Sequence, residues 1–134
     1  MNKDIAKTRL LDLYKIALAD GIIKQNEYHF ILDIAVKIGL TKDEALDIIN
    51  GEINFKLQKP QSYNDRMQHL FQMLFLMKID GEINPKEIEL ILNIALHLGL
   101  NLIMTKELVK VISNYKQNLV PQNEMIRIVK MHLN

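Results

Sequence analysis

The chain has 134 residues, a net charge of +1 at pH 7 and no cysteine. Its length is that of one domain with its own hydrophobic core. Because cysteine is absent, disulfide bonds and thiolate metal sites are excluded, and a reducing, cytoplasmic location is expected.

The charge and hydropathy patterns argue against two kinds of partner. Residues 1–67 contain ten Lys and Arg against ten Asp and Glu, and residues 68–134 contain seven against six. Neither half has the basic excess of a nucleic-acid-binding surface, so no nucleic-acid partner is expected. The apolar runs are far shorter than the ~20 residues that cross a bilayer, and the amino terminus lacks a signal-peptide core, so no direct membrane insertion is expected.

The first predicted elements are two amphipathic helices on either side of an Asp20-Gly21 turn. Apolar residues recur at helical spacing on both sides of the turn. They are Ile5, Leu10, Leu13, Ile16 and Ala17 before it, and Phe30, Ile31, Ile34, Ala35 and Ile38 after it. Gly39 is placed for a left-handed cap at the end of the second helix, and a capping box from Thr41 to Glu44 begins a third. This first unit spans about residues 4–50.

The next segment, residues 51–61, predicts a connector. Ile53, Phe55 and Leu57 alternate with polar residues before Pro60. This pattern is typical of an extended segment, or of one short strand, laid over the core.

Helical periodicity resumes in a second unit, over about residues 62–115. Ser62 is the predicted cap of a long helix, and Asn84-Pro85-Lys86-Glu87 is a strong start signal for the helix after a second Asp-Gly turn. Gly99 is placed to end that helix, as Gly39 does in the first unit. Thr105 and Pro121 are taken as the last two helix starts, with a carboxyl-terminal helix within residues 121–133.

The two units are copies of one pattern. A shift of 60 residues places positions 20–40 on positions 80–100 with ten identities and no gap. The shared residues include the Asp-Gly pair, the following Glu and the final Gly-Leu. We therefore predict an all-α fold, one domain over residues 1–134, in which about seven helices form a bundle from two repeated helix-turn-helix units.

The repeated motif resembles a known family. Ala19-Asp20-Gly21-x-Ile23-x3-Glu27, followed by an aliphatic helix and Gly39-Leu40, is similar to the tellurite-resistance TerB-like family. That family also includes the amino-terminal region of DjlA-type membrane co-chaperones. The resemblance covers roughly residues 5 to 115, and the segment beyond Tyr115 has no counterpart in it.

The resemblance implies an all-helical, non-enzymatic module that binds a divalent metal ion and acts with protein partners in stress responses near the membrane. Carried over residue by residue, the metal ligands would be Asp20, Glu27, Asp80 and Glu87, holding calcium, magnesium or manganese. One departure is Ile79, which stands where the first copy has an alanine before its Asp-Gly pair.

The motif is not an EF-hand, although Asp-Gly-x-Ile-x3-Glu also ends an EF-hand loop. With Asp20 at loop position five, Ile16 and Leu18 occupy positions one and three, where calcium needs oxygen ligands. In the second copy those positions are Leu76 and Lys78. Neither segment supplies the required ligands.

Two interpretations of the turn carboxylates stay open. In the simpler one, each Asp accepts hydrogen bonds from its own turn and each Glu completes a capping box, favoured by the helix dipole. In the other, the carboxylates of both copies converge on one oxygen-ligated cation, with Glu82 and Asp33 as further ligands. The first interpretation is the commoner situation in proteins.

Other residues suggest no catalysis. The four histidines lack zinc-site spacing and are interpreted as surface or helix-end residues, and the seven methionines as core side chains. No phosphate loop or Ser-His-Asp arrangement occurs, so no enzyme is predicted. The functional alternatives are a metal-binding TerB-like module and a protein-interaction or scaffold module whose acidic residues only cap helices.

Overall fold

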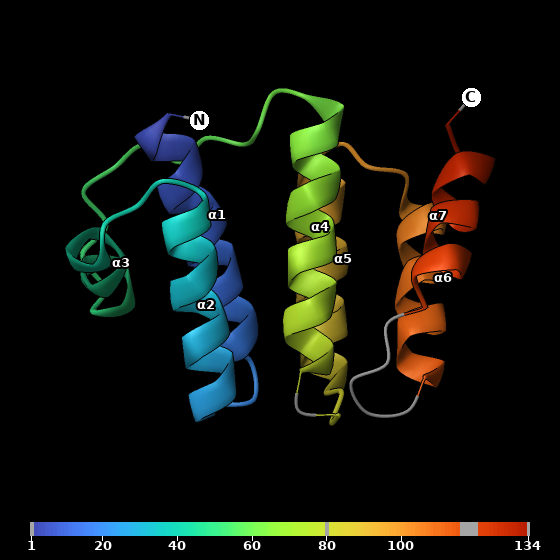
Figure 1. The fold of residues 1–134 in the computed structure, drawn as a ribbon, viewed down its shortest axis with the longest axis horizontal. Coiled ribbons are helices and arrows are strands. Elements are labelled where there is room, and N and C mark those ends of the chain that lie inside the picture. Colours follow the sequence, from blue (N-terminus) through green and yellow to red (C-terminus); the bar gives the residue numbers. More distant parts are fainter. Residues whose placement is uncertain (1, 80, 116–120, 134) are drawn as a thin grey trace.

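Seven α-helices lie in the computed structural model, which describes residues 2–79, 81–115 and 121–133 (Figure 1). The described residues contain no strand, so the all-α prediction of about seven helices is confirmed. None of these helices combines the length and the apolar character needed to cross a membrane. Their bounds are α1 Lys3–Ala17, α2 Gln25–Lys37, α3 Lys42–Ile49, α4 Tyr63–Lys78, α5 Pro85–His97, α6 Leu102–Asn114 and α7 Gln122–Met131.

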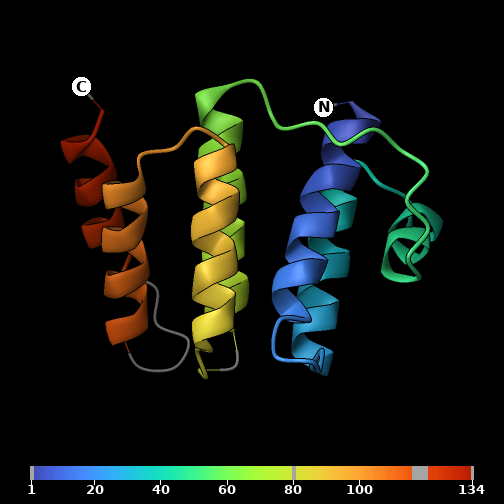
Figure 2. The same ribbon diagram turned by 180° about the vertical axis from the view of Figure 1, so that it is seen from behind.

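The helices are arranged as two hairpins that stand side by side. One hairpin is α1 with α2, the other is α4 with α5, and their turns lie at the same end of the molecule (Figure 1). At the opposite end, the connector from α3 crosses α1 on the side that faces the viewer in Figure 2 and reaches α4. Helices α1 and α4 therefore run in the same direction, and they pack against each other across the centre.

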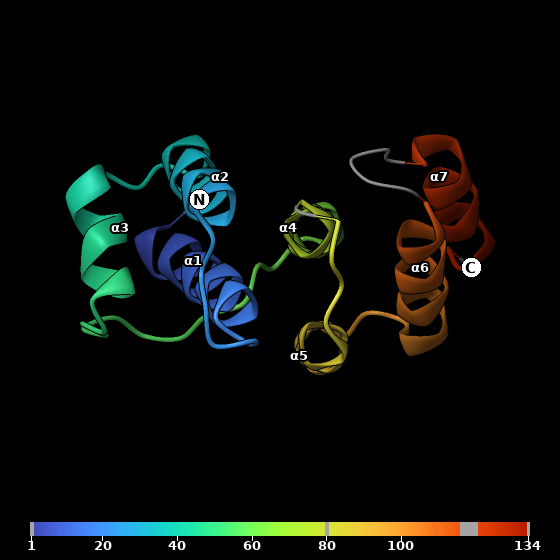
Figure 3. The same cartoon turned by 90° about the horizontal axis from the view of Figure 1, so that it is seen from below.

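The two repeats are related by an approximate twofold axis parallel to the helices. Seen along that direction, α2 and α5 lie on opposite sides of the α1–α4 pair, and α3 and α6 occupy the two flanks (Figure 3). Helix α7 lies beside α6, against which it packs. The connector and α7 are thus the main additions to the repeated plan.

The core consists of the apolar stripes that the helical periodicity predicts. Completely buried side chains from α1 and α4 occupy its centre, with α2, α5 and α6 contributing from the flanks. They include Leu10, Leu13, Ile16, Leu70, Met73, Leu74, Met77, Ile31, Ile91 and Leu108. Met67 and Met104 are buried as well, in agreement with the predicted core role of the methionines, whereas Met131 at the end of α7 is 65% exposed and the prediction is wrong for it.

The helix ends follow most of the predicted signals. Ser62 Oγ accepts a hydrogen bond from the Asp65 amide at 3.1 Å, so Ser62 caps α4. The predicted start of α6 at Thr105 is wrong, because the Asn101 side chain accepts from the Met104 amide and the helix begins at Leu102. Asn101 is the 60-residue equivalent of Thr41, which caps α3.

The connector is extended, as expected, and forms no strand within the described residues. Only Phe55 of its three alternating apolar side chains is half-buried, whereas Ile53 and Leu57 are exposed. The amide of Gln58 donates to Thr8 Oγ1 at 2.9 Å, which holds this part of the connector against α1.

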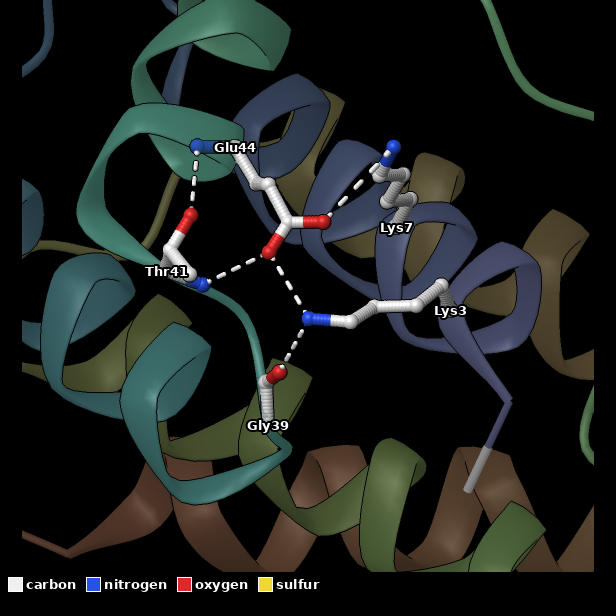
Figure 4. A network of polar contacts seen from close by, with 5 residues as sticks. All are labelled: Lys3, Lys7, Gly39, Thr41 and Glu44. Carbon is white, nitrogen blue, oxygen red and sulfur yellow. Dashed lines mark hydrogen bonds and ion pairs between the residues drawn. The ribbon is translucent and has the colours of Figure 1, made fainter.

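A polar network fastens α3 to α1 (Figure 4). Lys3 Nζ lies 2.8 Å from both Glu44 Oε1 and the carbonyl oxygen of Gly39, and Lys7 Nζ lies 3.9 Å from Glu44 Oε2. Glu44 also completes the predicted capping box, since it accepts from the Thr41 amide at 2.9 Å. The hydrogen bond from Lys3, followed by that from Thr41, lowers the pKa of Glu44 to about 2.

The glycine that ends α2 provides a test of this architecture. Gly39 has φ +94°, and the amide of Leu40 donates to the Ala35 carbonyl at 2.9 Å, as in a Schellman cap. Because a Cβ disfavours this conformation, Gly39→Ala is expected to lower the free energy of unfolding by about 1 kcal/mol. Urea unfolding followed by circular dichroism measures the change, with Lys37→Ala as the control. Equal effects of the two substitutions would contradict the strain argument.

Candidate functional site

The predicted site lies at the end of the bundle where both hairpin turns are found (Figure 1). Asp20 follows the last turn of α1, and its Oδ1 accepts from the amide of Ile22 at 3.1 Å. The glycines of both turns have positive φ, +92° at Gly21 and +79° at Gly81. Because a side chain disfavours positive φ, glycine is favoured at these two positions, which explains the glycine of each Asp-Gly pair.

The two predicted glutamates sit in the first turns of α2 and α5. Glu27 Oε1 accepts from the Lys24 amide at 3.0 Å, and Glu87 Oε1 accepts from the Asn84 amide at 3.0 Å. Both residues are buried, at 4% and 5% exposure. Each glutamate therefore caps its own helix, in the geometry of the simpler interpretation of the motif.

The two turns also meet each other. Lys24, which immediately precedes α2, places Nζ 3.4 Å from Glu82 Oε2 in the second turn. This ion pair joins the loops of the two copies across 58 residues of sequence. Asp80, the fourth predicted ligand, lies outside the described residues.

The described carboxylates at this end of the bundle take part in local hydrogen bonds that bear on whether they would hold a divalent cation. Asp20 bonds its own turn, and one oxygen of both Glu27 and Glu87 is taken by a cap amide. Across residues 2–79, 81–115 and 121–133, no three His, Asp or Glu side chains are grouped as metal ligands would be. Within this set the carboxylates of the two copies do not form a ligand cluster.

A second polar arrangement, which the sequence did not predict, lies between α1 and α4. Arg9 is completely buried and donates from Nη2 to Gln72 Oε1 at 2.5 Å. His69 is completely buried as well, and its Nε2 lies 2.9 Å from Asp12 Oδ2. A shift of 60 residues places Arg9 on His69 and Asp12 on Gln72, so the two contacts are equivalent across the twofold axis.

The burial of His69 corrects the interpretation of the histidines as surface or helix-end residues. His29 and His97 are exposed, but His69 lies inside the interface between the copies. Desolvation lowers the pKa of His69, and the hydrogen bond that His69 makes to Asp12 opposes this shift only in part. A sequence signal did exist, because Arg9 and His69 interrupt the apolar faces of α1 and α4 at equivalent positions.

An apolar groove lies between α4 and α7 on one side of the molecule. It has a volume of 220 Å³ and is lined by Phe71, Phe75, Gln122, Met125 and Ile126. The two phenylalanine rings are stacked, with centroids 6.4 Å apart. Ile126 is half exposed at 50%, although the neighbouring Met125 is buried. We call this the phenylalanine groove.

Comparison of the chain with protein-family models, with curated proteins and with solved structures finds no match. The functional interpretation therefore depends on the residues and their geometry.

The buried His69 makes a pH-dependent contribution to stability. Because burial lowers its pKa from the ordinary 6.5, the unfolded chain takes up a proton below pH 6.5 that the folded chain does not. The stability associated with neutral His69 is thus complete above pH 6.5 and is lost as the pH falls through the folded pKa. The contribution is at most about 1.4 kcal/mol per pH unit.

We expect His69→Gln to flatten the pH dependence of unfolding between pH 7.5 and 5, measured by urea titration at each pH. His29→Gln, at an exposed position on α2, is expected to leave the slope unchanged. The same slope in wild type and both variants would show that His69 does not titrate differently in the two states.

Proposed function

We propose that this chain is a non-enzymatic, TerB-like interaction module that binds a protein partner in the phenylalanine groove. The observation that carries the proposal is the apolar groove between α4 and α7, where two stacked, partly buried aromatic rings and the exposed Ile126 line the same hollow. Aromatic and aliphatic side chains in a concave, partly exposed patch are the usual anchors of protein interfaces.

The difference between the two copies supports this assignment. Phe75 is the 60-residue equivalent of Lys15, and Phe71 is the equivalent of Leu11. The first copy forms the same helix with the polar side chain of Lys15 at this position. The fold therefore does not require an aromatic side chain at Phe75. The resemblance to TerB-like proteins supports a stress-response or membrane-associated complex as the setting.

A photo-crosslinking experiment tests the partner site. A photoreactive phenylalanine analogue at Gln122, on the rim of the groove, is expected to give a discrete crosslinked product in cells that express the chain. Ile126→Lys in the same protein is expected to reduce the product by about tenfold or more, because it places a charge in an apolar contact. Mass spectrometry then identifies the partner, or a second copy of this chain.

The matched control is Leu96→Lys, which replaces a similarly exposed apolar side chain on α5, at 58% exposure compared with 50% for Ile126. This variant should retain the crosslinked product. If no product forms from Gln122, or if both lysine variants reduce it equally, the groove is not the partner site.

A divalent cation at the turns is the second candidate function. The contact between Lys24 and Glu82 supports it, because it brings the acidic loops of both copies to one place. The ligands would be drawn from Asp20, Glu27, Asp80 and Glu87, and oxygen ligands suit calcium, magnesium or manganese. Of these four, Glu27 and Glu87 each accept a hydrogen bond from a cap amide, so an ion would share these carboxylates with the helix caps.

Calorimetry distinguishes the cation site from simple capping. If the site exists, titration with each of the three ions gives saturable heat in the wild type, and Asp20→Asn/Asp80→Asn abolishes it. Asp47→Asn on the exposed face of α3, away from the turns, is the control for nonspecific loss of charge. Absence of heat in the wild type at millimolar ion would eliminate the cation hypothesis and leave the capping role.

A further inference from the structure

A larger groove lies on the side of α1 that faces α5 and the connector. It has a volume of 620 Å³, within the roughly 300–1,000 Å³ range of small-molecule sites. Its walls come from four separate parts of the chain, α1, the connector at residues 57–60, α4 through His69, and residues 90–98 in and just after α5. We call this the connector groove.

The walls of the connector groove are largely apolar. Leu57 and Pro60 contribute from the connector, Leu90 and Ile94 from α5, and Leu98 from the position directly after α5. Leu57 is 61% exposed, so this side chain lies at the open side rather than in the core. Such a lining would accommodate an aliphatic or aromatic body.

The charged groups around the connector groove are mainly cationic. Arg9, Lys15 and Lys59 are among its lining residues, whereas Asp12 is the only carboxylate among the described residues that line it. Asp12 is already bonded to His69. The excess of positive charge in a partly enclosed, apolar site favours an anionic ligand.

The two exposed lysines are available to contact such an anion. Lys59 Nζ donates to the His97 carbonyl oxygen at 3.3 Å, which places its ammonium group at the end of α5 and uses one of three donor positions. Lys15 is exposed on the last turn of α1, and it has no ion-pair partner within the described part of the chain. Both groups could bind a ligand without breaking a salt bridge.

The base of the connector groove is fixed by the contacts between the repeats. The hydrogen bond of Arg9 to Gln72 and that of His69 to Asp12 hold α1 and α4 in register beneath it. The Gln58 amide bonded to Thr8 holds the connector above it. The groove is therefore formed without a ligand, which lowers the ordering cost of binding.

We propose that the connector groove binds an amphipathic carboxylate, a small molecule whose apolar body lies against α5 and the connector and whose carboxylate pairs with Lys15 or Lys59. This ligand class follows from the combination of apolar walls and unneutralised ammonium groups. The site is separate from the phenylalanine groove and does not depend on the function proposed for it.

The test uses the full chain and three probes, octanoate, octanol and acetate, followed by amide shifts in two-dimensional NMR spectra. Octanoate is expected to cause saturable shifts at Leu57, Lys59, Asn93 and His97. Octanol lacks the charge and acetate lacks the apolar body, so each is expected to bind at least about tenfold more weakly.

The matched variants remove the two ammonium groups. Lys15→Gln/Lys59→Gln is expected to raise the dissociation constant of octanoate by about tenfold, in the range of two exposed charge pairs. Lys106→Gln, an exposed lysine on α6, is expected to leave it unchanged. Equal affinity for octanoate and octanol, shifts centred on Phe75 and Ile126, or no saturation at millimolar octanoate would overturn the proposal.

Discussion

The structure depends on a reciprocal polar contact between the first helices of the two repeats. Arg9 of α1 bonds Gln72 of α4, and His69 of α4 bonds Asp12 of α1. Each repeat contributes one buried cationic or ionisable side chain, Arg9 or His69, and the other repeat supplies its hydrogen-bond partner. Removal of one member would leave a buried polar group unpaired, at a cost of about 1–3 kcal/mol. Apolar stripes alone would allow α1 to slide along α4, whereas these two contacts specify one register.

That register determines where the functional surfaces lie. Because α1 and α4 run in the same direction, both Asp-Gly turns emerge at one end, where Lys24 contacts Glu82. The same packing leaves one groove against α1 and another against α4, which are completed by the connector and by α7, the two parts outside the repeated plan. The two sides have diverged: Lys15 lines the connector groove, whereas its equivalent Phe75 lines the phenylalanine groove. One repeated plan thus offers a cationic groove and an aromatic one.

Local signals in the sequence were sufficient to predict the helices. Each of these signals involves residues only a few positions apart in the sequence. They are the periodic apolar residues, the capping boxes at Thr41 and Asn84, and the glycines after α2 and α5. The start of α6 was missed because Thr105 resembles a cap, although the repeat itself points to Asn101. The grooves and the burial of His69 were not predictable in this way, since they arise from contacts between residues about 60 positions apart. The one sequence indication of the buried contacts was that Arg9 and His69 interrupt apolar helix faces at equivalent positions.

The identical residues of the two copies are accounted for by folding requirements, as far as the described residues show. Gly21 and Gly81 adopt positive φ, and Glu27 and Glu87 bond the cap amide at the same 3.0 Å. A turn with these constraints would be retained in both copies whether or not it bound an ion. Residues that differ between equivalent positions carry more information about function, because the shared fold does not require them. On this reasoning the functional difference between the connector groove and the phenylalanine groove lies in residues such as Lys15 and Phe75. The repeated Asp-Gly motif accounts for the shape of the two hairpins that carry these grooves.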